Sequence, residues 1–137
     1  MTTGPATADS FAARCIGGGA VLMLLGVALG AFGAHGLEDL VSPRQLESFR
    51  TGVAYQQLHA LALVMLGLVA RATIPTPPLR WSARLMVAGT VFFCGSIYAM
   101  IAGAPRWLGA VAPLGGLSFM AAWLLLARHA FVAARGR

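Results

Sequence analysis

Four long apolar segments without a charged residue constrain this chain more than any other feature of its sequence. They cover residues 15–34, 53–70, 85–103 and 108–127. A helix needs about 20 consecutive apolar residues to cross the hydrocarbon core of a bilayer, and each segment comes close to that length. The first segment is longer than the apolar core of a secretory signal, about 7–15 residues, so we interpret it as an uncleaved helix. The sequence therefore predicts an all-α chain, with four membrane spans in one domain over residues 1–137.

Composition supports the membrane assignment. The chain is 58% hydrophobic and only 10% charged, whereas a soluble domain carries roughly 25% charged residues. A soluble protein of this size could not bury so much apolar surface in one core. All ten basic residues are arginines, and they stand singly beside the apolar segments. This distribution is typical of membrane-flanking charges and not of a nucleic-acid interface, so we expect a lipid bilayer and no nucleic acid as partner.

The arginines also predict an orientation. Three of them, Arg44, Arg50 and Arg106, fall in the first and third connections. The other seven flank the opposite ends of the segments: Arg14, Arg71, Arg80, Arg84, Arg128, Arg135 and Arg137. Because cytoplasmic loops carry the excess of positive charge, both termini are predicted to be cytoplasmic. An even number of spans makes the bundle antiparallel, and a bacterial inner membrane is the expected location.

The connections differ in character. Ser42 and Gln45 are spaced as a capping box around Pro43, which suits the first position of a helix. We interpret the residues after Pro43 as a short amphipathic helix on the outer surface that leads into the second span; the alternative is a polar loop. Three prolines in the second connection predict an extended turn at Pro75, Pro77 and Pro78. Pro113 is expected to kink or loosen the fourth span near its outer end.

Small residues recur every four positions in three of the spans. Lipid provides no hydrophobic drive for helix association, so such stripes allow the backbones to approach closely. The predicted packing residues are Gly26, Gly30 and Ala34 in the first span, Gly95, Ala99 and Gly103 in the third, and Ala112 and Gly116 in the fourth. The pattern does not distinguish packing within one chain from packing between chains, so a homo-oligomer stays open.

Polar residues at membrane depth are costly without partners and therefore mark candidate sites. The candidate ligand-binding residues are His35, Tyr55, Gln56, His59, Ser96 and Tyr98. Topology places them all in the outer half of the bundle, with Tyr55 and His59 on one helix face because they are four residues apart. A hydrogen-bonded clasp between helices is the favoured interpretation. A metal site, a proton-coupled path and a catalytic site are weaker alternatives, because no carboxylate and no complete ligand or catalytic set accompanies these residues.

Four sequence motifs are similar to those of a known family. They are GAFGAHGL at residues 30–37, TGVAYQQLHALAL at 51–63, GSIY at 95–98, and PLGG at 113–116 with a later Trp123. In this order they resemble the domain-of-unknown-function 423 family, which includes bacterial inner-membrane proteins and the eukaryotic transmembrane protein 256. The sequence departs from the family pattern at Cys94, where the family has serine, and at Ala112, where it has threonine. The second departure argues against a polar ligand from the fourth span.

The resemblance implies a small multi-pass membrane protein without an assigned activity. We therefore expect a non-enzymatic accessory or interaction subunit of a membrane assembly, with no cofactor and no resident metal. The alternative is a binder or carrier of a small apolar molecule, such as a lipid or quinone, in the outer half of the bundle. A histidine-based metal site is the third hypothesis. Cys15 and Cys94 should lie at different membrane depths, so both are predicted to be free thiols.

Overall fold

The structure is a computed structural model that describes residues 5–135, and Arg137 lies outside the described residues. The described chain is helical and contains no strand. Its elements in order are α1 (Pro5–His35), α2 (Pro43–Ala72), α3 (Pro77–Gly89), the π-helical turn η1 (Thr90–Cys94), α4 (Gly95–Ile101), the 3-10 helix η2 (Arg106–Ala110) and α5 (Ala112–Arg135).

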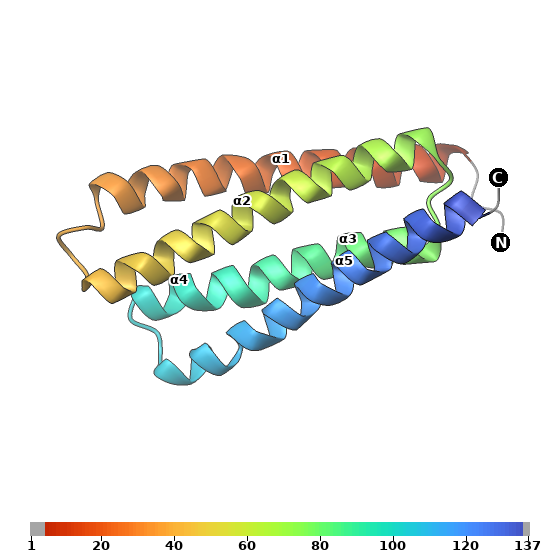
Figure 1. The fold of residues 1–137 in the computed structure, drawn as a ribbon. Helices are drawn as coiled ribbons and strands as arrows, with labels where there is room; N and C mark the ends of the chain where they lie inside the picture. The colour runs from red at the N-terminus through yellow and green to blue at the C-terminus, as the bar shows by residue number, and fades with distance from the viewer. Residues whose placement is uncertain (1–4, 136–137) are drawn as a thin grey trace.

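Four helical stretches of the described chain are long and apolar enough to cross a membrane. They are Asp9–His35, Pro43–Ala72, Pro77–Ile101 and Arg106–Arg135. Each contains one of the four predicted apolar segments, apart from the last two residues of the third. The stretches run antiparallel, and both ends of the chain lie at the same end of the bundle (Figure 1). The prediction of an all-α, four-span membrane bundle is confirmed.

α2 begins where the sequence predicts but continues further than expected. Ser42 is its N-cap, the Ser42–Gln45 capping box is formed, and Pro43 is the first helical residue. The helix then runs without interruption to Ala72. The predicted amphipathic stretch is helical and leads into the second span, but it is not an element between the first two spans: its turns are the first turns of α2.

Prolines start helices in two further places. α3 begins at Pro77, with Pro77 and Pro78 in its first turn. The extended turn predicted for the second connection is therefore shorter than expected, because proline fits the first helical positions, where no backbone donor is needed. In the fourth span, a turn at Val111 separates η2 from α5, and Pro113 lies in the first turn of α5. This agrees with the expected interruption near the outer end.

The bundle consists of two helix pairs, α1 with α2 and the third span with α5 (Figure 1). Glycines from both partners hold each pair together. A Cβ at Gly19 of α1 would lie 2.7 Å from the carbonyl oxygen of Ala60, and one at Gly67 of α2 would lie 2.9 Å from that of Ala12. Backbone atoms cannot move aside as a flexible side chain can. Glycine is therefore required on both sides of this contact.

The second pair uses glycine in the same reciprocal way. A Cβ at Gly89 would lie 2.5 Å from the Phe119 ring, and one at Gly115 would overlap the backbone of Phe93. Phe93 belongs to η1, so the π-helical turn is in close contact with α5. The hydroxyl of the fully buried Ser82 adds a hydrogen bond of 2.8 Å to the Ala122 carbonyl oxygen of α5.

The predicted packing stripes coincide only partly with these contacts. Gly26 and Gly30 do face α2, close to Gln57 and, for Gly30, to Val53 as well. A Cβ at Gly95 or Gly116, in contrast, would meet no atom within 4 Å, so neither position is a close contact within the chain. Gly103 lies beyond α4 with a φ of +98°, where it ends the helix instead of packing it. Ala34 is exposed, while Ala99 and Ala112 are half-buried.

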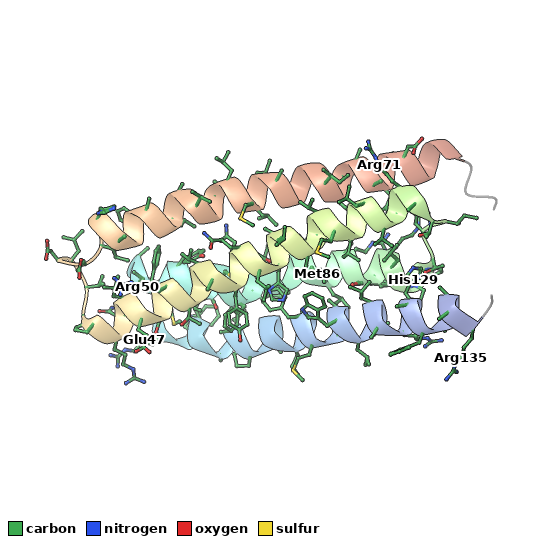
Figure 2. The ribbon with its side chains drawn as sticks, turned by 45° about the horizontal axis from the view of Figure 1, so that its top comes forward. Glu47, Arg50, Arg71, Met86, His129 and Arg135 are labelled. Carbon is green, nitrogen blue, oxygen red and sulfur yellow. The ribbon has the colours of Figure 1, made fainter. Side chains whose placement is uncertain are left out.

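Charged residues gather at the two ends of the bundle. Figure 2 shows Glu47 and Arg50 at the end that holds the first connection, and Arg71, His129 and Arg135 at the end that holds the termini. Apolar side chains fill the interior. One core cluster, which includes Leu66, Leu79 and Met86, lies toward the termini, and a smaller one around Phe49 and Val53 lies toward the first connection. Cys15 and Cys94 are both buried and free, as predicted.

Candidate functional site

A cluster of polar side chains lies on α2 between the two apolar clusters. Gln56 and His59 are its buried members, with exposed fractions of 4% and 3%. α2 packs against α1 and the third span, and the His59 side chain extends to Trp123 and Phe119 of α5. Hydrogen bonds to each of those neighbours make up the candidate site.

Gln56 connects three helices through one amide group. Its Nε2 donates to the Leu22 carbonyl oxygen of α1 at 2.9 Å, and its Oε1 accepts from the Tyr98 hydroxyl of α4 at 2.9 Å. The adjacent Gln57 donates from Nε2 to the Gly26 carbonyl oxygen at 3.0 Å. Gly26 is therefore important because it lets a glutamine side chain of α2 reach the backbone of α1.

His59 uses both of its ring nitrogens. Nδ1 lies 2.7 Å from the Tyr55 carbonyl oxygen, and Nε2 lies 3.1 Å from Nε1 of Trp123 on α5. An indole N–H can only donate, so Nε2 must be the acceptor and carries no proton. The proton is then on Nδ1, which donates to the carbonyl oxygen. His59 is a neutral imidazole of one defined tautomer, with both nitrogens engaged inside the chain.

Aromatic rings surround this histidine. The Phe119 ring stacks on the imidazole with a centroid distance of 3.5 Å and an interplanar angle of 14°. Gly89 makes room for Phe119 from the opposite helix, as its missing side chain leaves space for the ring. Tyr55 contacts Phe93 at a centroid distance of 4.8 Å. The imidazole is thus packed between rings as well as hydrogen-bonded, which fixes its orientation.

The six predicted candidate residues do not form a single site. Gln56 and Tyr98 share one hydrogen bond, and His59 stacks with Tyr55 at a centroid distance of 6.0 Å. Ser96 is buried, but its hydroxyl donates to the Phe93 carbonyl oxygen within the same span. His35 is exposed at the C-terminal end of α1 and takes no part in the contacts of the cluster. The predicted outer-half residues therefore do not share one role. Gln56, His59 and Tyr98 take part in hydrogen bonds between helices, which we call the clasp, whereas His35 lies exposed at the rim of the bundle.

Trp123, Phe119 and Gln57 belong to the site although they were not among the predicted residues. Trp123 and Phe119 are four residues apart, so they share one face of α5. That spacing was visible in the sequence, but which span they would face was not. Gln57 is adjacent to Gln56, and periodicity alone would place them on different faces of α2.

This arrangement has direct chemical consequences. With both imidazole nitrogens engaged, His59 has no lone pair for a metal ion, and no described group of three His, Cys, Asp or Glu side chains could hold one. Cavities of about 630 and 690 Å³ lie toward opposite ends of the bundle, and none of the six candidate residues lines either of them. The outer-half position proposed for a lipid or quinone is occupied by side chains at Gln56 and His59.

A Trp123→Phe substitution tests the clasp. It removes the indole N–H that donates to Nε2 of His59 but keeps an aromatic ring, so the free energy of unfolding should fall by about 0.6 kcal/mol and by no more than about 1.7 kcal/mol. Unfolding in a detergent titration measures the change. The ¹⁵N resonance of Nε2 should also shift, and Trp107→Phe, at an exposed position, is the control. An unchanged Nε2 resonance would show that the indole does not bond to His59.

The chain was compared with known proteins. The family model described as a protein of unknown function, DUF423, matches residues 29–116, which include all of the clasp residues on α2 and α4. The UPF0382 membrane protein SH2409 of Staphylococcus haemolyticus is 40% identical over 108 residues, covering 79% of this chain and 87% of the relative. YwdK of Bacillus subtilis, also named a UPF0382 membrane protein, is 40% identical over 79% of this chain and 88% of its own length.

A more distant relative, the UPF0382 inner membrane protein YgdD of Escherichia coli K12, is 38% identical over 100 residues, or 73% of this chain and 76% of the relative. No solved structure matches. The sequence motifs, the four spans and these relatives agree, and the chain belongs to the DUF423 family of multi-pass membrane proteins, whose function is unknown.

Proposed function

We propose that this chain is a non-enzymatic accessory subunit that binds another membrane protein through the outer face of α1, with both of its own termini in the cytoplasm. The orientation is supported by the arginines: six of the described ones lie near the helix ends at the side of the termini, and three lie toward the other end. Figure 2 shows Arg71 and Arg135 at the first end and Arg50 at the second. The binding role is supported by two features of the bundle, its closed polar interior and the composition of α1.

The polar interior is suited to holding the bundle together. The donors and acceptors of Gln56 and His59 are matched by groups of the same chain. General acid–base or nucleophilic catalysis requires a polar group that is free to react with a substrate. These side chains already form hydrogen bonds to α1, α4 and α5, so they hold the helices in a fixed arrangement. A fixed arrangement presents a constant surface to a binding partner.

The outer face of α1 carries the proposal. It lies opposite the side that packs on α2, and Leu24 lies on it with Val21 and Val27 at its edges. Its other members are small exposed residues at helical spacing: Ala13, Gly17, Ala20, Ala28 and Ala31. The exposed face of α5 has the bulky composition expected next to lipid chains, with Leu117, Met120, Leu124 and Phe131. A small-residue face lets the backbone of a second helix approach closely, so that van der Waals contact can hold two membrane proteins together.

Gly17 offers a direct test because it is free within the chain. A Cβ there would meet no atom within 4 Å, so Gly17→Leu should leave the fold unchanged while blocking the approach of a partner helix. We expect a photoreactive amino acid at Ala20 to crosslink to a partner protein in native membranes, and Gly17→Leu to remove that product. Gly116→Leu on α5, at a position equally free of contacts, is the matched control and should keep it.

Mass spectrometry of the crosslinked product identifies what was captured. A partner of different sequence supports the accessory role. A product made only of this chain would identify the face as a homo-oligomer interface and contradict that role. Crosslinking that survives Gly17→Leu would show that the captured contact does not depend on close helix approach at this face. No product at all from a folded chain would show that no partner lies on it.

A further inference from the structure

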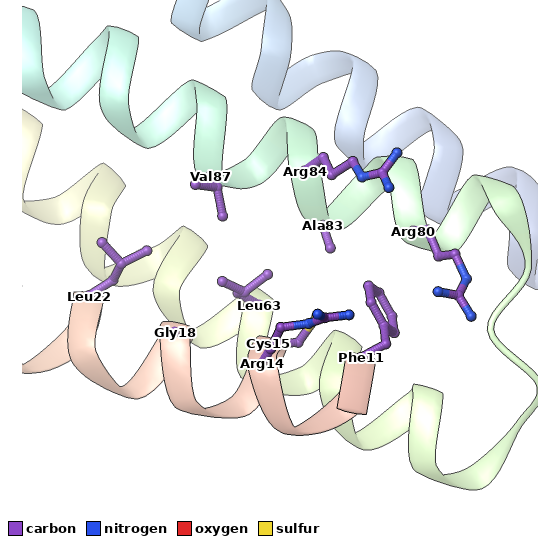
Figure 3. A pocket seen from close by; sticks show the side chains of 10 residues that line it. All are labelled: Phe11, Arg14, Cys15, Gly18, Leu22, Leu63, Arg80, Ala83, Arg84 and Val87. Carbon is purple, nitrogen blue, oxygen red and sulfur yellow. The ribbon is translucent and has the colours of Figure 1, made fainter. Parts of the chain in front are cut away.

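A cavity of about 630 Å³ opens between α1 and α3 at the end of the bundle that holds the termini. It exists because α1 packs on α2 and α3 packs on α5, while α1 and α3 are not in close contact with each other. Leu63 of α2 forms its floor. Figure 3 shows the lining residues on both walls: Phe11, Arg14, Cys15, Gly18 and Leu22 on α1, and Arg80, Ala83, Arg84 and Val87 on α3.

The charged groups of this cavity are all positive. Arg14, Arg80 and Arg84 line it, and no carboxylate does. Arg80 reaches from α3 toward Phe11 on α1, with its guanidinium carbon 5.1 Å from the ring centroid (Figure 3). Arg84 lines the wall but places its guanidinium over Trp81, at 5.0 Å. The cavity mouth therefore presents two arginine head groups, those of Arg14 and Arg80, near one aromatic ring.

Arg80 has a donor that the protein does not use. Its Nε donates to the Pro75 carbonyl oxygen at 3.3 Å, but its buried Nη2 has no hydrogen-bond partner. A buried donor without a partner costs free energy, and a guanidinium donor costs more because it is charged. Nη2 itself is closed off from the cavity, but Arg80 and Arg14 both line it, and an anion with several oxygen atoms would pair with these two guanidinium groups. The geometry of guanidinium groups suits phosphate oxygens in particular.

The rest of the cavity is apolar and has the length of one membrane leaflet. Gly18, Leu22, Leu63 and Val87 line the part farther from the arginines (Figure 3). The lining on α1 runs from Phe11 to Leu22, which at 1.5 Å per residue is about 16 Å. This is close to half of the roughly 30 Å hydrocarbon thickness of a bilayer. The arginines lie at the polar end of that distance, where lipid head groups are found.

From this arrangement we infer that the cavity binds one anionic phospholipid. Its phosphate lies between Arg14 and Arg80, and one acyl chain follows the groove past Gly18 toward Leu22 and Val87. The positive charge of the mouth selects a lipid with net negative charge over a zwitterionic one, since basic groups near the membrane surface attract anionic lipids. The site is independent of the proposed partner face, because the two lie on different sides of α1.

Native mass spectrometry of the full chain, released from nanodiscs of equal parts phosphatidylglycerol and phosphatidylcholine, tests the inference. We expect one phosphatidylglycerol to stay bound and phosphatidylcholine to be lost. The double variant Arg14→Gln/Arg80→Gln should reduce the retained lipid by about 25-fold, or roughly fivefold for each arginine. Arg71→Gln/Arg128→Gln is the matched control: it removes two charges from the same end, outside the cavity, and should retain the lipid.

Gly18→Phe separates the lipid from a free anion. A Cβ at Gly18 would be 3.9 Å from Leu63, so a larger side chain can enter the groove and displace the acyl chain while both arginines stay in place. We expect Gly18→Phe to lose phosphatidylglycerol and excess inorganic phosphate to leave the wild-type complex intact. Displacement by phosphate, with lipid retained in Gly18→Phe, would mean that the site binds only the anion.

Two other results would also overturn the inference. If phosphatidylcholine is retained as well as phosphatidylglycerol, the arginines do not select an anionic lipid. If the Arg71→Gln/Arg128→Gln control loses as much lipid as the Arg14→Gln/Arg80→Gln variant, the effect comes from net charge and not from the cavity. Arg80 also contacts Phe11 and Pro75, so the single variant Arg14→Gln, at an exposed residue, guards against a folding defect. It should show the fivefold loss with an unchanged circular dichroism spectrum.

Discussion

Replacing Gly115 by alanine is expected to destabilise the bundle by about 1–3 kcal/mol, a cost typical of overpacking. The added Cβ would overlap the backbone of Phe93, which is part of η1 and cannot turn aside. α5 and the third span would then have to separate, and separation also disturbs the stack of Phe119 on His59. Unfolding in a detergent titration, followed by tryptophan fluorescence, measures the loss, because Trp123 lies on the helix that must move.

Gly116→Ala, one residue further along, is the control for this substitution. A Cβ at Gly116 meets no atom within 4 Å, so only the helix propensity changes, and alanine is the better helix former. Gly116→Ala should therefore be neutral or slightly stabilising. Equal effects at the two positions would show that the close approach between Gly115 and Phe93 does not hold the second helix pair together.

Gly19→Leu is expected to release α1 from α2 while the second helix pair stays folded. Its side chain would meet the Ala60 carbonyl oxygen and Val64, both on α2, and α2 supplies most of the contacts of α1. The cost should exceed the 1–3 kcal/mol typical of overpacking, because four heavy atoms are added at a backbone contact. The hydrogen bonds from Gln56 to Leu22 and from Gln57 to Gly26 would be lost with it.

Amide hydrogen exchange in detergent micelles can locate this effect. In Gly19→Leu, protection should fall in α1 and in the part of α2 that contacts it, and remain in α3 and α5. Gly17→Leu adds the same side chain to the same helix at a position free of contacts, so its exchange should match the wild type. If protection falls uniformly in Gly19→Leu, the bundle unfolds as one unit and is not built from two separable pairs.

The sequence predicted the spans well because the membrane limits the possible folds. Only a helix or a closed barrel satisfies every backbone group in hydrocarbon, so about 20 apolar residues are enough to locate a span. The structure of the residues after Pro43 and near Pro77 was harder to predict from the sequence, since a polar stretch beside a span can either extend its helix or form a loop. The residues after Pro43 continue into the apolar segment of α2 without a break in the helix. At Pro77, proline occupies the first position of α3, so the helix starts there.

The packing residues were less predictable for a different reason. Four-residue spacing selects every small residue on a stripe, but only some of them meet another helix. Gly26 faces α2, whereas Gly95 and Gly116 meet nothing within 4 Å, and Gly19 and Gly115 form the close contacts. Helix rotation decides which glycine faces a neighbour, and rotation depends on all the partners together. For the same reason the bond between His59 and Trp123 could not be derived from either helix alone.

The π-helical turn at Thr90–Cys94 has a consequence for how sequences of such proteins should be aligned and edited. It accommodates one residue more than an α-helical path, and each residue of an α-helix accounts for about 100° of rotation. Deleting one residue from this turn would restore a regular helix and leave the residues after it facing the same way, so that Tyr98 would still point at Gln56. A one-residue gap in an alignment of the third span therefore belongs in this turn, because the same deletion in α3 or α4 would rotate the residues on one side of it by about 100° relative to the other.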